Sequence, residues 1–359
     1  MPTVTPDFYE KTDLWTYLSS SGKPIVLYGM GNGADKIVCE LSKRGLCVSD
    51  FFASSNFVRG QTFHSKKVLD FPSIKKKYKG CEYVVLLSFG SSRPEVLENI
   101  RRINDECELY VPDMPVYGDE LFDRAMLEAR FGEIKRARES LFDDRSREIF
   151  DALVNYKLSG KISFLDRTES SRQDIMSEVL SPEKYRNAID LGAFVGDSAA
   201  ELMSYAHSLE HVIALEPDSH SFKRLSSMTS PKLTAINAIA ADFDGEVMFS
   251  NEGNKNSSIY GQKKQISTRA VKVDTIAHDM HVDYIKIDVE GAEREALRGA
   301  DETIRRDRPD ISLSIYHRYD DFFDLVNKIG SLCPDHRLYI RRPEYLPPWD
   351  TSLYAVRSR

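Results

Sequence analysis

Carboxylates and glycines gather where an apolar segment turns into a helix, at residues 187–203, "NAIDLGAFVGDSAAELM". Asp190 lies at the end of a predicted strand, and Gly192 and Gly196 shape the turn that follows it. Glycine adopts backbone conformations that other residues avoid, and it lets a flat ligand approach the chain closely. Because open parallel sheets bind ligands at the carboxyl ends of their strands, we expect this turn to form a binding site.

The charge of this turn favours a cationic ligand. Asp190 and Asp197 flank it and would repel the pyrophosphate of a dinucleotide, which prefers a bare helix N-terminus. Glu216 ends the next predicted strand, "HVIALE", 20 residues after Gly196, where a carboxylate can accept hydrogen bonds from a ribose. S-adenosylmethionine carries a sulfonium and an ammonium and no phosphate, so it fits these charges. A simpler interpretation makes Asp197 a first-turn acid that only stabilises the helix dipole.

A second acidic segment, "YIKIDVEGAE", ends a strand predicted to lie beside the first, and it places Asp288 at the same sheet edge. Methyl transfer needs alignment of donor and acceptor, and an alcohol acceptor also loses a proton to a base or a metal site. His317, at the end of "ISLSIYH", is the candidate base. Alternatively, Asp288 and Glu290 could hold a divalent cation. Simpler interpretations make Asp288 a helix cap, His317 a structural histidine and Lys286 a surface residue of its strand.

Six segments carry a resemblance to a known family: "IDLGAFVGDSA", "VIALEPDSHSFKRL", "INAIAADFDGEVMFS", "VKVDTI", "YIKIDVEGAEREALRGA" and "ISLSIYH". In this order they resemble the FkbM-type methyltransferases over roughly residues 187–320, and "KIDVEGAE" is the most specific piece. The resemblance implies the class I S-adenosylmethionine-dependent fold. It also implies O-methylation of a hydroxyl on a carbohydrate, a lipid or another small molecule.

By position, the resemblance implies a cofactor turn, a ribose acid at Glu216 and an adenine wall at Asn237 and Ala240. The full predicted cofactor set is Asp190, Gly192, Ala193, Gly196, Asp197, Glu216, Pro217, Asn237, Ala240 and Asp288. The predicted catalytic residues are His317 and Asp288. No metal ligand is assigned, and a divalent cation is left open without further support.

An earlier glycine-rich turn, "VLYGMGNGADKI", raises a second hypothesis. Gly29, Gly31 and Gly33 open a helix after a strand, as in dinucleotide sites, but the third glycine comes one position early. The acid expected at the end of the next strand is missing, because Asp50 lies inside "LCVSDFF". We expect this turn to act as a scaffold or in acceptor recognition. The alternatives are a nucleotide- or sugar-nucleotide-binding module and, last, an NAD-dependent oxidoreductase.

Strand–helix alternation over 24–111 and 186–358, with helical spacing over 119–158, predicts three parts. These are a Rossmann-like α/β domain (1–115), a helical connector (116–180) broken near Gly132 and Asp143, and a class I methyltransferase domain (181–359). The last should hold a doubly wound, mainly parallel seven-stranded sheet with an antiparallel edge and an inserted hairpin. The polar segment 254–261 is expected at the hairpin tip.

The composition and net charge of the chain narrow the kinds of molecule it is expected to bind. The chain has 359 residues, of which 41% are hydrophobic and 29% charged, and its net charge of -7 argues against nucleic-acid binding. It has no run of 18 apolar residues and no secretory signal pattern, and its five cysteines are scattered. We therefore expect a cytoplasmic enzyme without a membrane span that acts on a small-molecule or glycan acceptor, with homo-oligomerisation left open.

Overall fold

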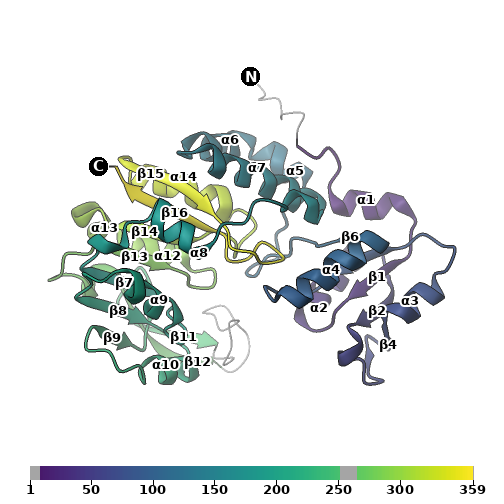
Figure 1. Ribbon diagram of the computed structural model, residues 1–359, viewed down its shortest axis with the longest axis horizontal. Helices are drawn as coiled ribbons and strands as arrows, with labels where there is room; N and C mark the ends of the chain where they lie inside the picture. The colour runs from purple at the N-terminus through teal and green to yellow at the C-terminus, as the bar shows by residue number, and fades with distance from the viewer. Residues whose placement is uncertain (1–8, 251–264, 359) are drawn as a thin grey trace.

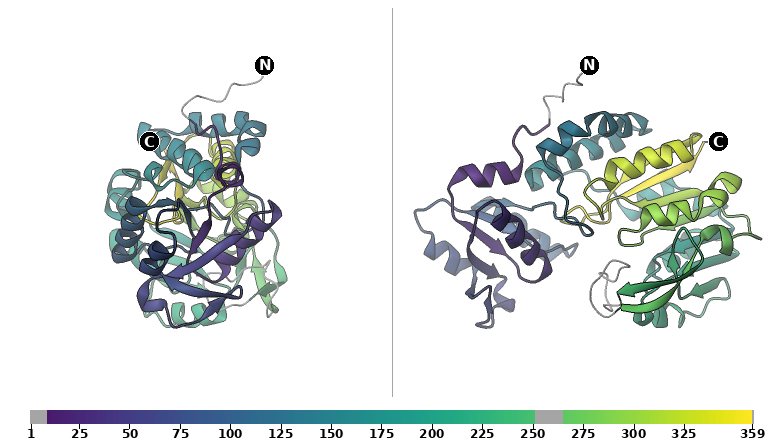
Figure 2. Two further views of the ribbon diagram at one scale, coloured as in Figure 1. Left: turned by 90° about the vertical axis from the view of Figure 1, so that its right-hand side faces the viewer. Right: turned by 180° about the vertical axis from the view of Figure 1, so that it is seen from behind.

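The computed structural model describes residues 9–250 and 265–358 and arranges them as two α/β units bridged by a group of helices (Figure 1). Seen from behind, the same bridging helices run along one side of the molecule, above both sheets (Figure 2). Within the described ranges, every helix is too short or too polar to cross a membrane.

The first unit contains a six-stranded sheet in the order β3-β4-β2-β1-β5-β6. Its strands are β1 (Ile25–Tyr28), β2 (Val48–Ala53), β3 (Thr62–Phe63), β4 (Lys66–Asp70), β5 (Val84–Leu87) and β6 (Glu108–Tyr110). All neighbours are parallel except β3 and β4, which form a short hairpin that the sequence analysis missed. Its polar residues, "QTFHSKK", lack the apolar pattern of a strand.

Four helices cover this sheet: α1 (Leu14–Ser21), α2 (Asn32–Lys43), α3 (Phe71–Lys77) and α4 (Pro94–Glu106). A short 3-10 turn, η1 (Ser55–Phe57), follows β2. The side chains of β1 alternate between two core clusters, with Leu27 packing beside α1 and α2 and Val26 beside α3 and α4. Both faces of the sheet are therefore buried, which explains why its central strands are uniformly apolar.

The bridging helices are α5 (Arg124–Ala129), α6 (Phe131–Ser140) and α7 (Asp144–Ser159). The first break falls at Arg130, next to the predicted Gly132, and the second ends at Asp143, whose side chain caps α7 by accepting from Ser146 N at 2.8 Å. The helix α6 packs on α14 and α7 packs on β15, so this group stabilises the second unit as well as joining it to the first. Short turns then lead to the second sheet: η2 (Ile162–Phe164), α8 (Arg172–Asp174), η3 (Ile175–Val179) and η4 (Pro182–Lys184).

The second unit contains a seven-stranded sheet in the order β15-β16-β14-β13-β7-β8-β9. Its strands are β7 (Asn187–Leu191), β8 (His211–Leu215), β9 (Leu233–Ile236), β13 (Tyr284–Ile287), β14 (Asp310–Ser314), β15 (His336–Arg341) and β16 (Ser352–Arg357). The strand β16 runs in the opposite direction to the other six, so both of its pairings, with β14 and with β15, are antiparallel. The predicted mainly parallel sheet with an antiparallel edge is thus confirmed, and the strand order reverses between β7 and β13.

The helices of the second unit are α9 (Asp197–Tyr205), α10 (Ser219–Leu225), α11 (Val273–Ile276), α12 (Glu293–Arg298), α13 (Asp301–Asp307) and α14 (Asp321–Leu332). The predicted hairpin is present as β11 (Gly245–Ser250) and β12 (Gln265–Val271), and it forms a separate small sheet with β10 (Ile239–Ala240). The segment 254–261 lies outside the described residues.

Candidate active site

A cavity of about 990 Å³ opens at the carboxyl ends of β7 and β13, where the strand order of the second sheet reverses. Most of its walls come from the second unit. The first unit contributes Asn32, Gly33 and Lys36 from α2, and the segment 114–117 forms another part of the wall. The predicted crevice therefore exists, and the first unit helps to close it, which was not predicted from the sequence.

The turn between β7 and α9 needs glycine for steric reasons. Gly192 has φ +77, and a Cβ there would lie 1.9 Å from the carbonyl oxygen of Asp288. Gly196 has φ +89, and a Cβ there would meet Met228 Sδ at 2.1 Å. Gly192 lines the cavity, whereas Gly196 and the buried Ala193 support the turn from behind. The two glycines thus let the turn pack against the end of β13 and against α10.

Glu216, the predicted ribose acid, lines the cavity directly after β8. Its two carboxylate oxygens accept hydrogen bonds from Phe194 N at 2.7 Å and from Asp218 N at 2.8 Å. Burial raises the pKa of Glu216 to about 7, although both backbone donors lower it. This carboxylate therefore fixes the glycine turn and also faces the cavity.

The predicted adenine wall is only partly on the cavity surface. Pro217 and Ala240 line the cavity, together with Ala238 and Ile239. Asn237 is not among the lining residues, and its side-chain amide instead donates to the backbone oxygens of Glu216 and Pro217 at 2.7 and 3.1 Å. Asn237 thus holds this wall in place from behind.

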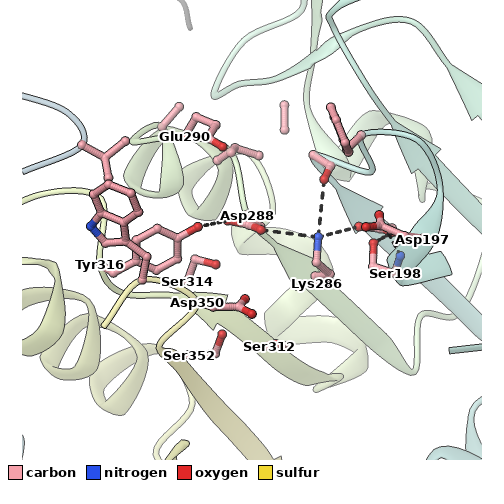
Figure 3. A pocket seen from close by; sticks show the side chains of 18 of the residues that line it. Asp197, Ser198, Lys286, Asp288, Glu290, Ser312, Ser314, Tyr316, Asp350 and Ser352 are labelled. Atoms are coloured by element: carbon pink, nitrogen blue, oxygen red, sulfur yellow. Dashed lines mark hydrogen bonds and ion pairs between the residues drawn. The ribbon is translucent and has the colours of Figure 1, made fainter. Parts of the chain in front are cut away.

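A half-buried lysine, Lys286, lies at the centre of the acidic cluster (Figure 3). The Lys286 ammonium is 3.1 Å from Asp190 Oδ1 and 3.9 Å from Asp288 Oδ2, and Ser198 donates to the other oxygen of Asp190 at 2.6 Å. Burial lowers the pKa of Lys286, but the carboxylates of Asp190 and Asp288 outweigh it and raise the pKa above its usual value. The interpretation of Lys286 as a surface residue is therefore wrong. Its register directly beside Asp190 on neighbouring buried strands was the available signal.

Asp288 lines the cavity and accepts a long hydrogen bond of 3.4 Å from the Tyr316 hydroxyl. It does not cap the following helix, because α12 begins only at Glu293. Instead, Oε1 of Glu293 accepts from the backbone amides of Val289 and Gly291, at 3.1 and 3.3 Å. Asp288 is thus available to the cavity, while Glu293 holds the loop that carries it.

His317 lies behind Asp288, with none of its surface exposed, and it is not among the residues that line the cavity. Its Nδ1 is 2.9 Å from Glu293 Oε1, and its Nε2 is 3.5 Å from Glu290 Oε2 and 3.7 Å from Asp288 Oδ1. Burial lowers the pKa of His317, but these three carboxylates together raise it to about 10. Because the imidazole is hidden behind the cavity wall, this placement argues against its predicted role as a base that touches the acceptor.

Tyr117 connects the bridging segment to the loop that carries Asp288. Its backbone amide donates to His317 O at 2.8 Å, and its ring packs over Gly291, where a Cβ would meet Tyr117 Cβ at 2.8 Å. The guanidinium of Arg318 stacks on the Tyr117 ring at 4.2 Å and donates to Gly291 O. Lys36 of α2 donates to the carbonyls of residues 115 and 116, so the first unit positions this segment.

The earlier glycine turn is filled by the protein itself. A Cβ at Gly29 would lie 2.5 Å from Ser88 Oγ and 2.6 Å from the ring of Phe89, and one at Gly33 would lie 2.1 Å from Ser88 O. Asp50 is paired with Lys77 and Tyr78. Gly29 and Gly33 therefore pack closely against the loop after β5, and Gly33 also lines the cavity, so both the scaffold role and the role in acceptor recognition stay predictions.

The same loop docks on the second unit. A Cβ at Gly90 would lie 2.5 Å from the Trp349 ring, and Ser91 and Leu346 exchange backbone hydrogen bonds of 2.9 and 3.0 Å. Trp349 lines the cavity. The packing of the first glycine turn thus helps to shape part of the cavity wall.

The second sheet, with its cavity at the point where the strand order reverses, has the class I methyltransferase fold, and the chain adds an N-terminal α/β unit to it. Residues 190–346 match the family model described as the methyltransferase FkbM domain. The chain thus carries an FkbM methyltransferase domain, and the family predicted from the sequence is confirmed.

One solved structure extends the likeness to the first unit. The structure of methyltransferase FkbM from Methylobacillus flagellatus KT is 19% identical, with 97% of this chain and 95% of that chain covered and a TM-score of 0.72, which shows a shared overall fold. Fibrillarin from Methanococcus jannaschii is 12% identical, covers 50% of this chain and 70% of its own, and has a TM-score of 0.34. Precorrin-6y C5,15-methyltransferase from Geobacter metallireducens GS-15 is 13% identical, with 48% and 79% covered and a TM-score of 0.32. No curated protein matches the sequence.

Proposed function

We propose that this methyltransferase moves a methyl group from S-adenosylmethionine to a hydroxyl of a small, polar acceptor such as a carbohydrate. The observation that carries the proposal is the row of Asp190, Lys286 and Asp288 beside the Gly192 turn, on the wall of a cavity that the first unit helps to close. In this proposal the row lies between the part of the cavity that binds the donor nucleoside and the part that binds the polar acceptor.

The residues of the turn fit the methyl donor. Pro217 and Ala240 offer an apolar wall for an adenine, and Glu216 faces the cavity beside them. Each oxygen of Glu216 accepts one backbone hydrogen bond, and a carboxylate has about four acceptor positions, so capacity remains for ribose hydroxyls. When bound, S-adenosylmethionine supplies an electrophilic methyl group on a cationic sulfur. Acidic groups at Asp197 and Glu201 also line the cavity and suit that positive charge.

The other half of the cavity suits a polyhydroxylated acceptor. Aromatic side chains at Tyr316, Tyr345 and Trp349 line it together with Asp350 and the hydroxyls of three serines: Ser312, Ser314 and Ser352 (Figure 3). Aromatic faces pack on the apolar faces of sugar-like rings, while carboxylates and hydroxyls bind their hydroxyl groups. This set of partners supports an alcohol acceptor better than a purely apolar one.

In this proposal Asp288 accepts the proton that the acceptor hydroxyl loses. Its carboxylate lies on the cavity wall, and the ammonium of Lys286 holds it beside Asp190. The Gly291–Tyr117–Arg318 contact fixes the loop on which Asp288 lies. A positioned base of this kind contributes about 10²–10⁴-fold to a rate.

The test is a comparison of ligands followed by identification of the product. S-adenosylhomocysteine should raise the melting midpoint, because a ligand of the native state stabilises it by about 2.7 kcal/mol at 100 times its Kd. NAD and nucleotide sugars should not raise it. Incubation of cell extracts with isotopically labelled donor should then yield an O-methylated product by mass spectrometry. A shift with NAD alone would favour an oxidoreductase, and a labelled N- or C-methyl product would contradict O-methylation.

A further inference from the structure

Three polar atoms are buried without hydrogen bonds behind the cavity wall. They are Oε2 of Glu293 and both ring nitrogens of His317, none of which makes a well-directed hydrogen bond to the described residues, although Nδ1 of His317 forms an ion pair at 2.9 Å with Oε1 of Glu293. Both side chains have no exposed surface. Native proteins nearly always satisfy such groups with protein atoms, water or an ion, so Oε2 of Glu293 in particular needs a partner that the described protein atoms do not supply.

The surrounding acids converge on the same point. Asp288, Glu293 and His317 each offer one ligand atom, and these atoms all lie within 4.8 Å of one another. Glu290 Oε2 lies 3.5 Å from Nε2 of His317, and Asp288 Oδ1 lies 3.7 Å from it. Two atoms bound to one ion at about 2.1 Å lie at most about 4.2 Å apart. The cluster therefore needs only small side-chain movements to surround an ion.

Backbone amides hold Glu293 in a position from which it could bind an ion. Its Oε1 is held by the amides of Val289 and Gly291, while its Oε2 stays unsatisfied. Metal-ligating carboxylates are commonly fixed by such outer hydrogen bonds. Glu290 has φ +52, a conformation that non-glycine residues rarely adopt, and this bends the loop so that Asp288, Glu290 and Glu293 surround one imidazole.

We propose that Asp288, Glu293 and His317 bind one divalent transition-metal ion, with Glu290 beside them. A mixed set of carboxylates and one imidazole suits ions such as Mn²⁺ or Fe²⁺ better than Ca²⁺. Asp288 and Glu290 also line the cavity, so an open coordination position would face the acceptor. The use of the ion in catalysis rests on the proposed function, but its binding does not.

Titration of metal-free protein with Mn²⁺, followed by electron paramagnetic resonance of the free ion, tests the site directly. We expect one bound ion per chain. His317→Ala and Glu293→Gln should weaken binding at least about tenfold. The matched control is His278→Ala, which removes an exposed histidine 2.8 Å from Asp279 and should leave Mn²⁺ binding unchanged.

Two further variants keep the test valid if the buried substitutions prevent folding. Asp288→Asn and Glu290→Gln change half-buried side chains and should also weaken Mn²⁺ binding at least about tenfold, with far-UV circular dichroism unchanged. Wild-type protein without saturable Mn²⁺ binding, or equal binding in the folded variants, would overturn the proposal. Calorimetry with S-adenosylhomocysteine on the same samples separates the two hypotheses, because donor binding can persist when the metal site fails.

Discussion

The two glycine-rich turns occupy the same place in two different sheets, yet their surroundings differ. One follows β1 between β2 and β5, and the other follows β7 between β8 and β13. At the first turn, Ser88 and Phe89 pack beside Gly29 and Gly33, and only the edge of the turn, at Asn32 and Gly33, reaches the cavity. At the second, the turn packs on the backbone of Asp288 and faces a large cavity.

The charged side chains near the two turns also differ in whether they reach the cavity. Asp50 in β2 is neutralised inside the first unit by Lys77, whereas Asp190, Lys286 and Asp288 form a row at the cavity wall. Glycine spacing therefore indicates close backbone packing in both places. Only the charged side chains that face open space distinguish the ligand site from the scaffold.

The largest expected effect comes from a matched pair of glycine substitutions. Gly192→Ala and Gly33→Ala both push a Cβ to about 2 Å from a carbonyl oxygen, at 1.9 and 2.1 Å. Both should destabilise the fold by about 1–3 kcal/mol through overpacking. Only Gly192→Ala should abolish measurable S-adenosylhomocysteine binding in calorimetry, because it displaces the donor turn. Equal loss of affinity in Gly33→Ala would erase the distinction between the turns.

A second pair compares the two lysine–aspartate contacts. Lys286→Met should lower the methyl-transfer rate about 100-fold or more and destabilise the protein by roughly 2–3 kcal/mol, because it leaves Asp190 buried without its cation. Lys77→Met removes a more exposed partner of Asp50 and should cost under about 1 kcal/mol. Chemical denaturation and initial rates measure both. A Lys286→Met enzyme with normal turnover would contradict the role of the charged row.

A substitution of the proposed base, Asp288, should change the rate of methyl transfer without changing the affinity for the donor. Asp288→Asn should lower the methyl-transfer rate about 10²–10⁴-fold while the Kd of S-adenosylhomocysteine changes less than about threefold. Asp50→Asn, which changes the paired acid of the first unit, should leave both quantities close to wild type. Normal turnover in a folded Asp288→Asn enzyme would remove the proposed role.

The smallest effect concerns pH. Burial raises the pKa of Glu216 to about 7, so below that pH the group is protonated and loses an acceptor for the ribose. Affinity for S-adenosylhomocysteine should therefore fall by up to about tenfold per unit as the pH drops below 7. Glu216→Gln should bind weakly but with a flatter pH profile.

The stability contribution of Glu216 has the opposite sign. Its pKa is higher in the folded protein than in the unfolded chain, so the folded state binds the proton more tightly. The contribution of this group to the unfolding free energy should fall as pH rises from the ordinary value of 4.5 to about 7. Chemical denaturation of wild type and Glu216→Gln across this pH range measures this contribution. If the unfolding free energy of wild type minus that of Glu216→Gln rose with pH, the raised pKa of Glu216 would be contradicted.

Local patterns predicted the strands that hold the site, because buried parallel strands such as β7 and β13 are short apolar runs with an acid at the end. The same patterns could not give the burial of His317, since this depends on Glu290 and Glu293 folding back around it. Period-two alternation also left open which face of β13 Lys286 would take.

Contacts between segments that are far apart in the chain could likewise not be predicted from the sequence. Lys36 reaches the carbonyl oxygens of residues 115 and 116, and the loop at Gly90 packs on Trp349, only because the two units fold against each other. The role of the first glycine turn followed from the three-dimensional positions of Ser88 and Phe89. No spacing of glycines along the chain encodes what will fill the space beside them.

Calorimetric titration of S-adenosylhomocysteine into wild-type protein, Asp190→Ala and Asp50→Ala is the decisive test of whether the turn after β7 binds the methyl donor. We predict one binding event per chain in wild type and in Asp50→Ala, and loss of that event in Asp190→Ala with the fold retained. Folded wild-type protein that releases no heat, or Asp190→Ala that binds like wild type, would contradict it.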